Sequence, residues 1–412
     1  MHPSERVDGS RLWNKLMDLA RFGAREDGGV DRQTLTETEI AARAELVSWG
    51  RTLGLSPYTD AAANLFLRFE GSDPTLPPVL TGSHIDSQPT GGKFDGAYGV
   101  LAAFEAVQAM RDAGLSPRRA IEIVAWTNEE GSRFSPGMTG SDLFTGTRTL
   151  DDLRDNRDSA GVRLEEALAR VLAADVDIPH RPFGFPVAAF VEAHIEQGPL
   201  LERAQIPVGV VTGIQGTRRY RVRVHGEAAH AGTAERHERK DALMAAVRII
   251  AAIDAAAMEP ADTKLTVGLF EVTPNAPSVV PAEVYFAIDL RHPDNAVVDR
   301  LDLRIHELVE SHRGPCQVDL KRIQHSPSLQ FDPRIRARIA TAADAIGIMH
   351  QDIYSAAGHD ARQLHYVCPT GMIFVPCRDG VSHNPAEWAE PSDLTAGTRL
   401  LADTVWHLAN EP

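Results

Sequence analysis

Two short apolar runs that end in polar turns, with a helical segment between them, constrain the fold of this chain most. Pro78–Leu80 leads into the turn TGSHIDS, and Ala120–Trp126 is a continuous apolar run typical of a buried parallel strand. Between them, Val100–Ala113 has its apolar residues at helical spacing. Because parallel strands need a crossover connection, this order predicts an α/β fold with a mixed, mostly parallel sheet.

A second pattern begins after the glycine-containing turn at 211–216. The run RRYRVRVHG alternates polar and apolar residues as a half-exposed strand does, and further helical and alternating segments follow it. This order predicts a smaller α+β module with antiparallel strands. Residues 330–412 return to the earlier helix-then-strand pattern, so we expect one domain of residues 1–212 and 330–412, interrupted by an inserted domain of residues 213–329.

Length, charge and cysteine content narrow the class of protein. The chain has 412 residues, 43% of them hydrophobic and 24% charged, which is typical of a globular protein with more than one domain. Its formal net charge of −15, with no basic cluster to offset it, argues against nucleic acid or an anionic membrane as a partner. Three cysteines without metal-type spacing, and an N-terminus without a signal-peptide pattern, predict a cytoplasmic location.

His84 and Asp86 lie two residues apart, directly after an apolar strand. Side chains at this spacing point the same way in extended backbone, and open α/β sheets bind ligands at the carboxyl ends of their strands. A metal-binding histidine with a supporting carboxylate is therefore one interpretation. The other is a polar turn in which Asp86 only caps the backbone.

Further metal-binding residue types follow in similar positions. Asp95 lies in the glycine-rich run TGGKFDGAYG, and the adjacent Glu129 and Glu130 come directly after the strand AIEIVAW. Two neighbouring carboxylates that are removed from water repel each other, unless a divalent cation lies between them. One of them could then bind the cation while the other serves as general base. His194 ends another possible strand, and His383 lies in a polar loop near the C-terminus.

Each of these residues has an ordinary explanation when taken alone, as a surface acid or a loop histidine. Together, three histidines and two carboxylates suit a borderline divalent metal such as zinc, manganese, cobalt or nickel. With a bridging carboxylate, five ligands can hold two ions about 3.5–4 Å apart. The glycines around Asp95 match neither a dinucleotide-binding nor a Walker phosphate loop, so we expect no nucleotide site.

Seven motifs, in this order, make the chain resemble a known family. They are GSHIDSQPTGGKFDG, WTNEEGSRF, EAHIEQGP, GEAAHAGT, DLRHP, AGHDA and SHNPAE. The set resembles the N-carbamoyl-L-amino-acid hydrolase group of the hydantoinase/carbamoylase family, which includes β-ureidopropionases and allantoate amidohydrolases and lies in the M20 metallopeptidase clan. The resemblance extends from about Leu12 to the C-terminus.

The resemblance implies roles for the five metal-binding candidates. In the family, residues matching His84 and His194 hold one metal ion, and residues matching Glu130 and His383 hold the other. The match to Asp95 bridges the two ions.

The resemblance also implies roles in catalysis. Glu129 falls on the catalytic base, and Asp86 on a carboxylate that orients a histidine ligand. His230, in the inserted domain, matches a histidine that reaches across a dimer to the scissile carbonyl. Gln197 matches a residue that contacts the substrate amide. The inserted domain would accordingly dimerise and act as a lid.

Besides Gln197 and His230, five further residues are expected to bind the substrate. Arg291 ends a strand, where its planar guanidinium could clamp a carboxylate. His359 falls on a substrate-side loop of the family, and Gly358 would allow the ligand to approach closely. The family often has a second asparagine before the arginine strand, where this chain has Ser278. Carboxylate binding is therefore expected to be weaker, shifted to Asn275, or adapted to another substrate length.

Taken together, the residues and the resemblance predict that the protein is a metal-dependent amidohydrolase and a homodimer. It would cleave the carbamoyl C–N bond of an N-carbamoyl-L-amino acid or 3-ureidopropionate to an amino acid, ammonia and carbon dioxide, as the resemblance implies. An allantoate amidohydrolase is one alternative, and an M20-type dipeptidase or aminoacylase acting on a peptide or acyl amide is another. The last alternative is a binding paralogue that has lost catalysis.

Overall fold

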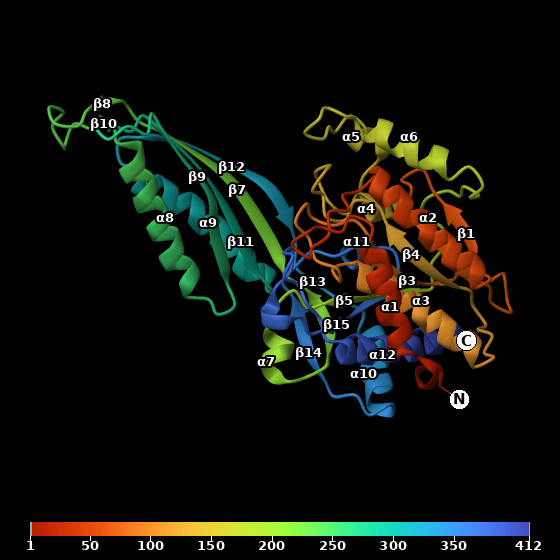
Figure 1. Ribbon diagram of the computed structural model, residues 1–412. Helices are drawn as coiled ribbons and strands as arrows, with labels where there is room; N and C mark the ends of the chain where they lie inside the picture. Colours follow the sequence, from red (N-terminus) through yellow and green to blue (C-terminus); the bar gives the residue numbers. More distant parts are fainter. Residues whose placement is uncertain (1, 412) are drawn as a thin grey trace. The chain divides into compact units, whose positions relative to one another are not determined.

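The computed structural model describes residues 2–411, which form two compact units (Figure 1). Of the described residues, the first unit comprises 2–212, 331–353 and 357–411, and the second comprises Gly213–Gln330 and Tyr354–Ala356. The sequence pattern predicts Gln330 and residues 354–356 in the first domain, and here the structure differs. They belong to the second because the Tyr354 hydroxyl bonds to the backbone oxygen of Leu329 and to the side chain of Gln330.

A nine-stranded sheet has most of its residues in the first unit, with strand order β1-β2-β4-β3-β5-β15-β6-β13 and β14 paired to β6. The strand β13 and the last two residues of β6 and of β14 are counted with the second unit. Its strands are β1 (Ser56–Thr59), β2 (Leu65–Phe69), β3 (Val79–His84), β4 (Ile121–Trp126), β5 (Ala189–Ile195), β6 (Val208–Ile214), β13 (Leu329–Gln330), β14 (His350–Ser355) and β15 (Thr370–Val375). The neighbours β4, β3, β5 and β15 run parallel, and every residue in these four strands is buried. Strands buried on both faces need continuous apolar runs, as the sequence predicted.

Helices cover this sheet and complete its core. They are η1 (Pro3–Arg6), α1 (Gly9–Ala20), α2 (Glu37–Thr52), α3 (Ala97–Asp112), α4 (Thr139–Thr145), α5 (Leu150–Leu153), α6 (Leu164–Ala174), α7 (Leu200–Ala204), α10 (Pro333–Ala345), α11 (Ala361–Leu364), η2 (Arg378–Gly380) and α12 (Pro391–Asn410). The helix α3 packs against β3 and α12, and its residues are almost all buried. It is the crossover helix that the sequence predicted, and it begins three residues earlier than expected.

The second unit is an antiparallel sheet with two long helices. The sheet has the order β12-β7-β11-β9, and a separate pair joins β8 to β10. The elements are β7 (Gly216–His225), β8 (Ala229–His230), α8 (Ala242–Met258), β9 (Lys264–Thr273), β10 (Val279–Val280), β11 (Glu283–His292), α9 (Asn295–His312) and β12 (Gln317–Ser326). Alternate residues of β7 and β11 are buried beneath the two helices, which gives this unit its own hydrophobic core.

Two general features of the chain are also defined. All three cysteines are buried and unpaired, and the cytoplasmic location remains a prediction. Across residues 2–411, no helix combines the length and the apolar character needed to cross a membrane.

Candidate metal centre

The first unit brings the five metal-binding candidates together. Parallel strands β3, β4 and β5 end at the same edge of the sheet, which gathers the residues that follow or end them. His84 ends β3, Glu130 follows β4, His194 lies in β5, Asp95 lies two residues before α3, and His383 lies between β15 and α12. Two overlapping ligand sets result: His84, Asp95 and His194 in one, and Asp95, Glu130 and His383 in the other.

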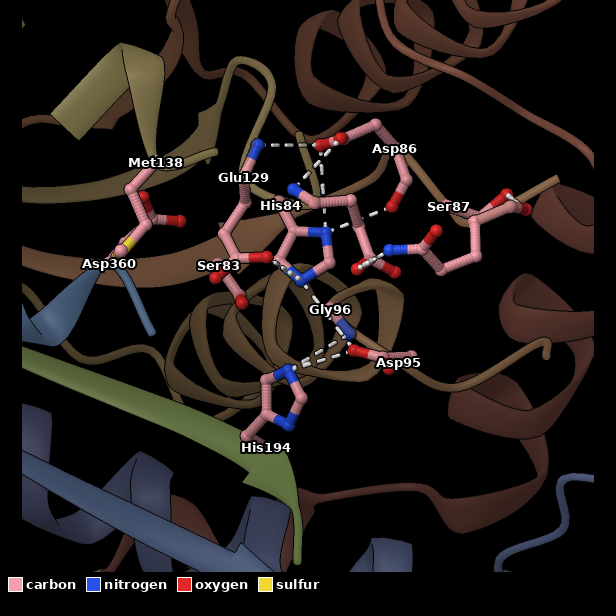
Figure 2. A network of polar contacts seen from close by, with 12 residues as sticks. Ser83, His84, Asp86, Ser87, Asp95, Gly96, Glu129, Met138, His194 and Asp360 are labelled. Atoms are coloured by element: carbon pink, nitrogen blue, oxygen red, sulfur yellow. Dashed lines mark hydrogen bonds and ion pairs between the residues drawn. The ribbon is translucent and has the colours of Figure 1, made fainter. Parts of the chain in front are cut away.

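Asp95 lies at the centre of both sets. Its Oδ1 is 3.6 Å from Nε2 of His84 and 3.2 Å from Nε2 of His194 (Figure 2). Its Oδ2 faces the other way, 3.1 Å from Nε2 of His383, and that nitrogen is also 3.3 Å from the Glu130 carboxylate. One carboxylate therefore presents one oxygen to each set, which is the geometry that a bridging ligand needs.

Backbone carbonyls orient the two buried imidazoles. Nδ1 of His84 is 2.9 Å from the backbone oxygen of Asp86, and Nδ1 of His194 is 2.9 Å from that of Ile195. A carbonyl oxygen only accepts, so each Nδ1 carries a hydrogen, and each Nε2 is the ring nitrogen that faces Asp95. This is the tautomer in which an imidazole binds a metal through Nε2.

Burial and neighbouring charges shift the pKa values of the site. Burial alone would raise the pKa of Asp95, but the three facing histidines hold it well below its ordinary value. Burial raises the pKa of Glu129 well above its usual range and that of Glu130 to about 7. The hydrogen bond to Asp95 raises the pKa of His383 to about 9.

Asp86 differs from its expected role in one detail. Its carboxylate accepts from the backbone N–H groups of Glu129 and Glu130, both at 3.2 Å, and lies 3.6 Å from Nδ1 of His84. Its backbone oxygen, rather than its carboxylate, makes the closer contact to His84 (Figure 2). Asp86 thus joins the end of β3 to the turn after β4.

Glu129, the candidate base, shares this environment. Its Oε2 lies 3.6 Å from Nε2 of His84, and its side chain is 11% exposed. A carboxylate that is largely sheltered from water, with a raised pKa and beside a ligand set, is suited to accept a proton from a reacting water.

The expected substrate residues of the first unit also lie at this site. Gln197 donates from Nε2 to Oδ2 of Asp95 at 2.8 Å, while its buried Oε1 has no hydrogen-bond partner. The ring of His359 packs edge-on against His194, with centroids 4.5 Å apart, and burial lowers its pKa well below the ordinary value. A Cβ on the preceding Gly358 would touch only the end of the Met138 side chain, at 3.7 Å.

The expected residues of the inserted domain fall into two places in the second unit. His230 and Ser278 lie side by side. The strands β8 and β10 pair with each other, and the backbone N–H of Ala231 donates to the backbone oxygen of Ser278 at 2.9 Å. The nearby Asn275 is exposed, with a φ of 54°. Nδ1 of His230 accepts from the backbone of Gly232 at 3.1 Å, which leaves its hydrogen on Nε2.

Arg291 lies near the end of β11 and already has a carboxylate partner. Its Nε and Nη2 donate to the two oxygens of Asp289, at 2.7 and 3.1 Å, and its Nη1 donates to the backbone oxygen of Ala356 at 3.0 Å. A substrate carboxylate would have to compete with Asp289 for this guanidinium.

The donor set fits divalent cations. At Asp95, a carboxylate oxygen and two imidazole lone pairs face one another, and such groups attract only when a proton or a cation lies between them. Three imidazoles with carboxylates are the nitrogen and oxygen donors preferred by zinc and its neighbours in the first transition row. The chain therefore carries candidate ligand groups for metal ions.

Two residues that shape the site were not predicted from the sequence. The buried Asn128 has a φ of 56° and donates to the Phe134 oxygen and the Thr139 hydroxyl, both at 2.7 Å, which fixes the turn before Glu129. Asparagine's tolerance of left-handed backbone was the only signal for it. The fully buried Arg32 donates to the Ile85 oxygen at 2.6 Å, and nothing in its local sequence indicated that role.

Comparisons with known proteins place the chain in a family context. Residues 80–407 match the peptidase family M20/M25/M40. The chain is 40% identical to an N-carbamoyl-L-amino acid amidohydrolase of Geobacillus stearothermophilus, over 98% of this chain and 99% of that protein. It is 36% identical to an allantoate amidohydrolase of Bacillus subtilis, over 95% of each. Its fold matches the crystal structure of a hydantoinase/carbamoylase family amidase from Burkholderia multivorans, with a TM-score of 0.92 and 41% identity over 99% of both chains.

Gly96 gives a first test of the ligand geometry. Its φ is 63°, and a Cβ there would lie within 2.3–2.4 Å of the His84 imidazole. We predict that Gly96→Ala displaces this ring and loses bound cation, measured by elemental analysis after dialysis. Gly114→Ala, at the other end of α3, is the matched control, since its φ is 67° but nothing lies within 4 Å of the added Cβ. Both substitutions should cost on the order of 1–3 kcal/mol of backbone strain, because each places a side chain on a residue with positive φ. Equal cation content in the two variants would contradict the prediction.

Proposed function

Since this chain belongs to the peptidase family M20/M25/M40, and within it to the hydantoinase/carbamoylase amidases, we propose that it hydrolyses the carbamoyl C–N bond of N-carbamoyl-L-amino acids. The enzyme is a hydrolase of linear, non-peptide amides. The observation that carries the proposal is the Asp95 carboxylate, whose two oxygens face two sets of nitrogen and oxygen ligands.

Two divalent cations, each zinc, manganese, cobalt or nickel, are assigned to these ligand sets. His84 and His194 would hold one and Glu130 and His383 the other, with Asp95 between them. Bound there, the cations would lower the pKa of a water molecule and polarise the ureido carbonyl.

Glu129 is assigned as the general base. Its raised pKa and its place beside His84 suit it to take a proton from the attacking water and to return that proton to the departing nitrogen. Asp86 supports it, because the hydrogen bond from the Glu129 backbone to Asp86 fixes the turn that carries the base.

Two contacts would select the substrate. The unpartnered Oε1 of Gln197 can accept a hydrogen bond from a ureido N–H group. Arg291 would bind the substrate carboxylate, with Asp289 holding the guanidinium in place until then. Gly358 and His359, and Asn275 and Ser278 in the other unit, are assigned to the remaining contacts.

A homodimer is proposed from the second unit. The strand β9 is an edge of its sheet, and large apolar side chains of this unit are nearly half exposed: Met244 and Val247 in α8 at 46%, and Phe270 in β9 at 42%. Unpaired strand edges and contiguous apolar patches are typical of interfaces. A second copy of the chain would pair along β9, and His230 would then serve the partner's site by donating from Nε2 to the developing oxyanion.

The rival activities share the cation site and differ in substrate. An allantoate amidohydrolase would also use Arg291, and its substrate would carry a second ureido group. A dipeptidase or aminoacylase would act on a peptide or acyl amide. An inactive binding paralogue would hold cations without turnover.

A turnover panel separates these activities. N-carbamoyl-L-amino acids, 3-ureidopropionate, allantoate, N-acyl amino acids and dipeptides would be tested with added Mn²⁺ or Zn²⁺. We expect the highest kcat/KM on an N-carbamoyl-L-amino acid. If the cation-loaded protein hydrolyses none of these compounds, the proposal is wrong.

Removing the base should affect chemistry more than binding. We predict that Glu129→Gln keeps its cations but loses on the order of 10²–10⁴ in kcat, the usual share of general acid–base catalysis. The control is Glu196→Gln, because Glu196 is a buried carboxylate of the same unit that accepts from the backbone N–H groups of Leu200 and Leu201. It should retain its rate. A near-normal kcat for Glu129→Gln would contradict the assignment of Glu129 as general base.

The assignment of His230 to the partner's site can be tested by subunit exchange. Two inactive proteins, His230→Ala and Glu129→Gln, should recover activity when mixed under conditions that exchange subunits, because a hybrid dimer contains one site with both residues intact. Activity would be compared with the proportion of hybrids measured by native mass spectrometry. Hybrids without activity would mean that His230 acts within its own chain or has no role.

The Arg291 clamp predicts a separation of kinetic constants. Arg291→Lys keeps the charge but loses the planar pair of donors, so KM should rise much more than kcat falls, since a carboxylate is bound in both ground and transition states. Steady-state kinetics on two N-carbamoyl-L-amino acids would measure this. An unchanged kcat/KM on every carboxylate substrate would exclude the clamp.

A further inference from the structure

A buried glutamate near the C-terminus contacts the loop that carries Asp95. The Glu387 side chain is 3% exposed, and its Oε1 accepts hydrogen bonds from the backbone N–H groups of Phe94 at 2.8 Å and Asp95 at 3.1 Å. These bonds join residues 293 and 292 positions apart in the chain. Charge-assisted bonds to a carboxylate are stronger than bonds between neutral groups, so they fix the backbone at Asp95 firmly.

The Asp95 loop is shaped to receive this carboxylate. A Cβ on Gly92 would lie 2.1 Å from the carboxyl carbon of Glu387 and equally close to its Oε1. Only glycine leaves room for the glutamate here, because any other side chain would overlap it. The loop and the glutamate therefore fit each other within the first unit.

A serine connects Glu387 to the Asp95 carboxylate itself. The Ser382 hydroxyl lies 2.8 Å from Oδ2 of Asp95 and 3.1 Å from Oε2 of Glu387. Because a hydroxyl has one hydrogen, Ser382 donates to one of these carboxylates at a time. The segment 382–387 thus contacts both the backbone and the side chain of Asp95, and it also contains His383.

We propose that Glu387 is a positioning residue for Asp95: it holds the Asp95 backbone directly, and together with the Asp95 carboxylate it contacts the Ser382 hydroxyl, so that Oδ1 faces His84 and His194 while Oδ2 faces His383. The segment that supplies His383 thereby also orients the carboxylate shared by both ligand sets. This inference rests on the proposed function, because its test measures the binding of the divalent cations that the proposed function assigns to this site.

The experiment compares substitutions of Glu387 in the full chain, with Mn²⁺ alone as the probe. Cation content after dialysis and affinity by competition with a chelator would be measured beside kcat and KM. Glu387→Ala should bind Mn²⁺ about 10–100-fold more weakly, the usual effect of removing a group that supports a metal ligand. Glu387→Gln should stay near wild type, since its amide oxygen can accept from both N–H groups and its NH₂ can donate to Ser382, which then donates to Asp95.

A buried carboxylate outside the site is the control for general destabilisation. Glu105 in α3 is fully buried and accepts from the backbone N–H of Asp8 at 2.7 Å. Glu105→Ala should lower the melting temperature of the metal-free protein, as Glu387→Ala does, but leave Mn²⁺ affinity unchanged. A merely structural role for Glu387 would give the same pattern as Glu105.

The outcomes separate the inference from the proposed function. If wild type binds no divalent cation, the proposed function fails. Suppose instead that wild type binds Mn²⁺. If Glu387→Ala then has the same Mn²⁺ affinity as wild type and as Glu105→Ala, the inference alone is overturned. Should Glu387→Ala fail to fold, Glu387→Asp replaces it, because the shorter side chain draws the carboxylate away from Phe94 and Asp95. Wild-type affinity in Glu387→Asp would then overturn the inference.

Discussion

Several carboxylates are buried at one edge of the sheet, and the structure depends on the interactions that compensate their negative charge. Asp86, Asp95 and Glu129 are all largely withdrawn from water and close to one another. Carboxylates brought together in this way repel and resist ionisation. Backbone N–H groups balance Asp86, and histidines balance Asp95. A pair of divalent cations would balance the remainder, so a charge arrangement that opposes folding becomes one that favours cation binding.

The parallel sheet makes this arrangement possible. The strands β3, β4 and β5 deliver His84, the Glu129–Glu130 turn and His194 to one place because their carboxyl ends coincide. Backbone carbonyls then set the tautomers of the two buried histidines. The sheet therefore supplies both the position of the ligands and the direction of their lone pairs.

Much of the site could be predicted because its residues follow recognisable local patterns. Apolar runs ending in TGSHIDS and TNEEGS marked strand ends, and the order of seven motifs indicated the family, which the comparisons confirm. The α/β fold class is likewise confirmed. The partners of individual side chains were not predictable. The Asp86 carboxylate, expected to orient His84, lies 3.6 Å from Nδ1 of His84 and also accepts from two backbone N–H groups, which the sequence did not indicate. Arg291 is held by Asp289 two residues away.

The sequence by itself determined which residue types stand at strand ends and which strands are buried, because both follow from periodicity over a few residues. It did not determine which side chains meet across the fold. The hydrogen bond from Phe94 to Glu387 joins residues 293 positions apart, and the fit of that carboxylate over Gly92 exists only once α12 and the preceding segment have packed against the sheet. Tertiary structure decided these contacts, because hydrogen-bond partners are selected by distance and direction in space and no local pattern encodes either.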